Sequence, residues 1–137
     1  MTLIDRMNEL LEAERSGIIV YEQMSFLSPN KGINRMFAAI RNNEALDCEI
    51  LHSLISQRDV RPSDNMNGFA DKVMALEDEK ERLALVLRGL AWVVRKIDEL
   101  PGEELTQAEQ DFFRQMRGQH LWNIGSLREL LQEMEKR

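Results

Sequence analysis

Apolar side chains recur at helical spacing along almost the whole chain, and only three prolines in 137 residues interrupt that spacing. Residues three, four and seven positions apart share one face of an α-helix, whereas a strand requires strict alternation, which this chain lacks. The pattern therefore predicts an all-α fold. Four long helices are expected at 3–26, 31–57, 78–100 and 105–135.

Capping and turn residues stand at the expected helix ends. Thr2 is placed to cap the first helix, and Ser28-Pro-Asn-Lys-Gly32 is a turn cluster before the second. Pro101-Gly102 ends the third helix, and Thr106 with Glu109 forms a capping-box pattern that opens the fourth. These signals predict a short connection between the first and second helices and another between the third and fourth.

The connection between the second and third long helices is much longer, at about 58–77, and contains a short helical pattern from Phe69 to Leu76. A connection of about 20 residues can cross the length of a helical bundle, whereas short connections join antiparallel neighbours. We therefore expect a single four-helix bundle domain over residues 1–137, with a long crossover that makes the second and third long helices parallel.

Composition narrows the classes of partner. The net charge is −6, and lysine and arginine are interspersed with acidic residues, which argues against a nucleic acid as the main partner. Cys48 has no second cysteine with which to form an internal disulfide, and no apolar run approaches the roughly 20 residues of a membrane span. We expect a cytoplasmic protein that binds neither nucleic acid nor membrane.

Ionisable residues fall on three of the apolar helix faces, where an unpaired charge costs several kcal/mol to bury. Glu14 lies on the face of the first helix, Glu44 and Asp47 on that of the second, and His120 on that of the fourth. Each residue alone is compatible with a hydrogen-bonded core group. Together, carboxylates and an imidazole from facing helices are the donor set of iron and manganese sites.

These residues resemble the ferritin-like superfamily. Glu14 followed by Tyr21 is similar to the ligand glutamate and core tyrosine of bacterioferritins and rubrerythrins, and Glu44 arrives near the expected glutamate of the second helix. The resemblance covers the whole chain and implies a four-helix bundle around a di-metal centre. Within the superfamily the chain is also similar to a group of small bacterial domains, through residues 12–17, 88–95 and 120–124.

The chain departs from the metal-binding pattern of that superfamily. Its Glu-x-x-His motif reads Glu44-Ala-Leu-Asp47 in the second helix and Arg117-Gly-Gln-His120 in the fourth, and 84–87 offer no ligand in the third. Arg117 would place a permanent charge where a second metal belongs. We therefore expect an incomplete di-metal site. Its surrounding core polar network is expected to comprise Tyr21, Arg117, Arg88, Arg95 and Asn123.

Two functions follow from these residues, besides a binding module for a small ligand or a partner helix, for which exposed Met and Trp would be the signal. The first is a non-enzymatic, structural or regulatory bundle in which the buried charges form a network and no cofactor is bound. The alternative is a metal-binding protein or oxidoreductase that holds one iron or manganese ion through Glu14, Glu44 and His120, with Asp47 as a further candidate. The sequence leaves open whether the protein is an enzyme.

The remaining reactive and aromatic residues are assigned structural roles. The literal Glu49-Ile-Leu-His52 motif is about 200° round the helix from Asp47 and is expected on the surface. Cys48 is expected to be a buried, inert thiol, and Trp122 to pack in the core or at an interface.

The helix at 78–100 is apolar around much of its circumference, including Leu85 and Trp92, which predicts a homo-oligomer.

Overall fold

The computed structural model describes residues 1–136, and their architecture is all-α, as the sequence predicts. The predicted bounds of the four long helices are confirmed to within two residues at each end. The described part of the chain has no strand, and none of its helices is long and apolar enough to cross a membrane. The elements are α1 (Leu3–Leu27), α2 (Lys31–Ser56), α3 (Phe69–Met74), α4 (Glu79–Asp98), η1 (Gly102–Glu104, a short 3-10 helix) and α5 (Gln107–Glu135).

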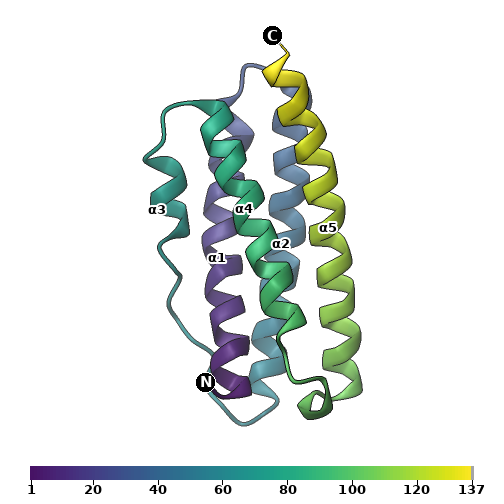
Figure 1. Ribbon diagram of the computed structural model, residues 1–137. Coiled ribbons are helices and arrows are strands. Elements are labelled where there is room, and N and C mark those ends of the chain that lie inside the picture. The colour runs from purple at the N-terminus through teal and green to yellow at the C-terminus, as the bar shows by residue number, and fades with distance from the viewer. Residues whose placement is uncertain (137) are drawn as a thin grey trace. The chain divides into compact units, whose positions relative to one another are not determined.

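These elements divide into two compact units. The first, Met1–Met74, holds α1, α2 and α3, and the second begins at Ala75 and holds α4, η1 and α5. In the first unit, α1 and α2 lie side by side as an antiparallel hairpin, and α3 packs against α1 (Figure 1). The apolar side chains buried on these helices include Met7, Leu10, Leu11, Val20, Met24, Phe37, Ile40, Leu51, Ile55 and Val73.

The capping signals of the sequence are confirmed by side-chain hydrogen bonds. Thr2 with Asp5 and Thr106 with Glu109 each form a complete capping box at the start of α1 and of α5. At the start of α2, the Asn30 side chain accepts hydrogen bonds from two backbone N–H groups of the first turn. Each cap satisfies donors that the helix itself leaves unpaired, which fixes where the helix begins.

The long connection after α2 is held against α1 by side chains of that helix. Arg15 donates to the backbone carbonyls of Ser63 and Asn65, while Asn8 accepts from the backbone N–H of Ser63 at 2.8 Å. The hydroxyl of Ser63 in turn donates to Glu12 at 2.6 Å. A segment without regular structure is therefore ordered by hydrogen bonds that replace those of a helix or sheet.

In the second unit, α4 and α5 form another hairpin, connected through η1 (Figure 1). One face of each helix is buried, and Glu109 of the capping box is buried with it. The buried apolar side chains of this unit include Leu83, Val86, Leu90, Val93, Phe112, Phe113, Met116, Ile124 and Leu127.

Ser16 anchors α3 to α1, since its buried hydroxyl accepts a hydrogen bond from the backbone N–H of Ala70 at 2.7 Å. Ser16→Ala would leave that buried N–H without its acceptor, and we expect the free energy of unfolding to fall by about 1–3 kcal/mol. Urea denaturation measures the loss, and amide exchange at Ala70 should accelerate. The exposed Ser56 provides the control substitution, and equal stability of the two alanine variants would contradict this role.

Candidate metal site

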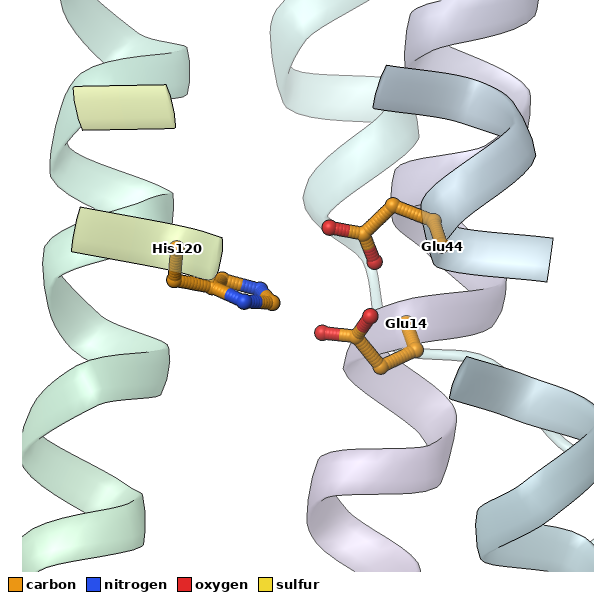
Figure 2. A group of neighbouring side chains, drawn as sticks. All are labelled: Glu14, Glu44 and His120. Atoms are coloured by element: carbon orange, nitrogen blue, oxygen red, sulfur yellow. The ribbon is translucent and has the colours of Figure 1, made fainter. Parts of the chain in front are cut away.

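The α1–α2 hairpin brings two buried acidic side chains together. Glu14 of α1 and Glu44 of α2 are only 1% and 3% exposed, and a carboxylate oxygen of one lies within 4.8 Å of a carboxylate oxygen of the other. Figure 2 shows the two carboxylate groups next to each other. The structure thus confirms that the two glutamates singled out in the sequence are buried neighbours.

Gly17 gives the Glu44 carboxylate its space. A Cβ atom added at Gly17 would lie 3.3 Å from Oε2 of Glu44 and 3.3 Å from Cε2 of Tyr21, which is tighter than most real Cβ contacts. A glycine inside a helix costs about 1 kcal/mol relative to alanine, so the close approach accounts for its presence. Sequence reasoning did not assign this role, although a glycine three residues after Glu14 was the available signal.

Tyr21 lies beside the two carboxylates and is almost completely buried. Its ring stacks on that of Phe37 across the hairpin, with ring centroids 6.2 Å apart. Burial first, and then the nearby charges of Glu44 and Glu14, raise the pKa of Tyr21 well above its usual range. The phenol therefore keeps its proton at any ordinary pH and can act only as a neutral hydrogen-bonding group.

His120 of the second unit is buried, with an exposed fraction of 1%. Its Nδ1 lies 2.9 Å from the backbone carbonyl oxygen of Met116, one turn earlier on α5. Because a carbonyl can only accept, Nδ1 carries the proton of this hydrogen bond. In the neutral form of this imidazole, Nε2 therefore carries the lone pair that can bind a metal. Figure 2 shows the His120 ring on α5.

Asn123 is buried on the same helix and accepts a hydrogen bond from Gln119 at 3.2 Å. Its expected position in the core is thus confirmed, and Gln119 is a partner that the sequence analysis did not name. Asp47, by contrast, is only half-buried. It lies three residues after Glu44 on α2, which turns its side chain about 60° away from the carboxylate pair.

The structure corrects the placement of Arg117. Its guanidinium is partly exposed and forms a forked ion pair with Asp98 at the end of α4, with Nε to Oδ1 at 2.7 Å and a second contact at 3.3 Å. The hydrogen bonds and charge of Asp98 raise the pKa of Arg117. An acidic partner at the helix end holds this arginine, so its side chain is not a buried counter-ion.

Arg88 and Arg95, which were also expected in the core polar network, are likewise corrected, because both are exposed. They lie about 140° and about 120° round α4 from the buried Leu83, and so belong to its polar face. Glu49 and His52 of the literal Glu-x-x-His motif are exposed, as predicted from their position on α2. Of the expected core polar network, Tyr21 and Asn123 are thus buried, as are Glu14, Glu44 and His120.

The fold and these residues define an all-α protein with a buried carboxylate pair and a buried, metal-competent histidine. The chain belongs to the family described as Domain of unknown function (DUF6306), whose pattern matches residues 2–129. Comparisons with curated proteins and with solved structures gave no match.

Cys48 is half-buried, and the pKa of its thiol depends on the charges of the carboxylate pair. Burial, followed by the charges of Glu14 and Glu44, raises the pKa of Cys48 to about 12. We therefore expect alkylation of the folded protein to be slow at pH 8 and to accelerate only as the pH approaches that value. The rate should rise to that of an ordinary thiol in urea, and Glu44→Gln should lower the pKa. A folded-state rate equal to the rate in urea would contradict this electrostatic environment.

Proposed function

We propose that this chain is a metal-binding protein in which the two hairpins pack as a ferritin-like four-helix bundle around one Fe²⁺ or Mn²⁺ ion. The ligands in this proposal are Glu14 and Glu44 of the first unit and His120 of the second. The observation that carries the proposal is the pair of buried carboxylates held together by α1 and α2.

The carboxylate pair favours a cation for electrostatic reasons. Two carboxylates in a low-dielectric interior repel each other, and either a cation joins them or one of them is protonated. The Arg117 guanidinium, the positive charge that the sequence places near this site, is bound to Asp98 instead. A divalent ion bound by both carboxylates would supply the positive charge instead.

The hydrogen bond of His120 supports its role as a ligand. Histidines that bind metals commonly donate the N–H of the other ring nitrogen to a backbone carbonyl or a carboxylate, which fixes the ring and its tautomer. The bond from Nδ1 to the Met116 carbonyl is of this kind, and Nε2 is the nitrogen that would bind the ion. Because Met116 precedes His120 on the same helix, this hydrogen bond orients the imidazole from within α5.

The donor set indicates which ions suit the site. Two carboxylates and one imidazole combine hard oxygen donors with a borderline nitrogen, a donor set that suits Fe²⁺, Mn²⁺ and Zn²⁺. Three protein ligands leave coordination positions for water or another small molecule. A second ion would require further ligands, and the corresponding positions hold Arg117 and the apolar run 84–87.

The second candidate function is the metal-free, structural or regulatory bundle. The incomplete ligand set favours it, because Asp47 and Arg117 replace residues of the superfamily's metal-binding motif. In that case Nε2 of His120 would be protonated and would itself supply the positive charge beside the carboxylates. The two candidates differ in what occupies the space between the same three side chains, so metal titration distinguishes them.

Titration of metal-free protein with Mn²⁺ or Fe²⁺ should give one ion per chain. Glu14→Gln, Glu44→Gln and His120→Gln each remove a donor, and each should weaken binding by more than the roughly 10–100-fold that loss of an outer partner costs. Glu49→Gln and His52→Gln are matched controls from the exposed motif of α2, and they should bind as the unchanged protein does. Absence of a stoichiometric ion, or equal loss in the control variants, would sink the proposal.

Gly17→Ala tests the geometry of the site without removing a ligand. The added methyl group would press on the Glu44 carboxylate and the Tyr21 ring, so we expect metal affinity to fall. Stability should change little, because alanine gains about 1 kcal/mol of helix propensity to offset the contact. Gly118→Ala is the control, since its added methyl group meets nothing within 4 Å. Unchanged metal affinity in Gly17→Ala would contradict the close fit around Glu44.

A further inference from the structure

The outer face of α5 carries two large apolar side chains next to each other, Leu121 and Trp122, which are 44% and 73% exposed. They lie on the side of the helix opposite the buried Met116, Asn123 and Leu127. We propose that this face, from Arg114 to Glu129, binds the same face of a second copy of this chain, with the two α5 helices antiparallel. The proposal is independent of metal binding, because His120 lies on the buried side.

Two glycines flank this apolar pair and are unexplained by contacts within the chain. Gly118 and Gly125 lie inside α5 and are exposed, and a Cβ added at either one would meet nothing within 4 Å among the described residues. Glycine weakens a helix relative to alanine, so such positions need a reason. A partner backbone that approaches closely at both glycines, with the Trp122 ring packed beside them, provides that reason.

Charge complementarity identifies the partner as a second copy. Along the exposed face the order is Arg114, Gly118, Leu121-Trp122, Gly125, Glu129, which reads positive, small, apolar, small, negative. An antiparallel copy related by a two-fold axis between Leu121 and Trp122 places each residue opposite its complement. Arg114 then faces the other copy's Glu129, Gly118 faces its Gly125, and Leu121 faces its Trp122.

The present contacts of Arg114 allow it to pair with Glu129 of the other copy. Arg114 forms an ion pair with Asp111 on its own helix at 3.3 Å, and both side chains are largely exposed. Exposed pairs of this type contribute little to stability, so the guanidinium is available to a second acidic group. Two symmetric Arg114–Glu129 pairs would then set the orientation and register of the two helices, while Trp122 supplies the apolar contact.

This surface replaces the one expected from the apolar helix at 78–100. On that helix, α4, Leu85 and Trp92 are both half-buried. The ammonium group of Lys96 also lies over the Trp92 ring, 5.5 Å from its centroid. The exposed apolar area of the second unit's helices is therefore centred on Trp122.

Sedimentation of the full chain over a range of concentrations tests the pairing. We expect a reversible dimer, which Trp122→Ala should convert to monomer at concentrations where the unchanged protein is paired. Phe26→Ala is the matched control, because Phe26 is the other strongly exposed aromatic residue, at 80%, and lies at the end of α1. A monomer at every concentration, or a dimer unaffected by Trp122→Ala, would overturn the proposal.

Charge reversal tests the register. Arg114→Glu and Glu129→Arg should each raise the dimer dissociation constant several-fold, because each places like charges opposite each other in both symmetric pairs. The double variant should restore the dissociation constant of the unchanged protein. Arg114 and Glu129 are about 22 Å apart on one helix, so the rescue can come only from the second copy. If the double variant does not form a tighter dimer than both single variants, this antiparallel register is excluded.

Cysteine pairing gives a second measure of the register, in a Cys48→Ser background. A mixture of Gly118→Cys and Gly125→Cys chains, oxidised with copper phenanthroline, should form mainly disulfide-linked heterodimers. Each variant alone should link slowly, because its own cysteines are offset from one another by about 10 Å along the axis. Equal linking of each variant with itself would also contradict the proposed pairing.

Discussion

The rest of the site depends on the placement of two buried carboxylates, those of Glu14 and Glu44, together in one helical hairpin. Burying charge of like sign is unfavourable, so the surrounding residues must accommodate it. Gly17 provides the space, the Tyr21 phenol stays neutral, and the pKa of the Cys48 thiol is raised to about 12. A site of this kind is stabilised when a cation joins the carboxylates, which is why we propose a metal.

Most of the secondary structure could be predicted because it depends on local signals. Helical spacing located the four long helices, and Thr2 and Thr106 located two of their starts through hydrogen bonds within one turn. Glu14, Glu44 and His120 could be identified as buried because each lies on an otherwise apolar helix face. The same reasoning placed the Glu49 and His52 motif on the surface.

Contacts between helices could not be predicted in the same way. The expected inward turn of Arg117 ignored Asp98, 19 residues away in sequence, whose carboxylate holds the guanidinium at the helix end. The role of Gly17 likewise required the position of Glu44, which belongs to the neighbouring helix. Periodicity reports which face of a helix is buried, but it does not report which residue of another helix meets it.

The central claim is that one ion is bound by Glu14, Glu44 and the Nε2 atom of His120. Electron spin-echo spectroscopy of the Mn²⁺-loaded protein tests it most directly, because a nitrogen bound to Mn²⁺ modulates the echo. The account predicts modulation from one imidazole nitrogen, present in the unchanged protein and in His52→Gln and absent in His120→Gln. Mn²⁺ bound without nitrogen modulation, or modulation that persists in His120→Gln, would contradict it.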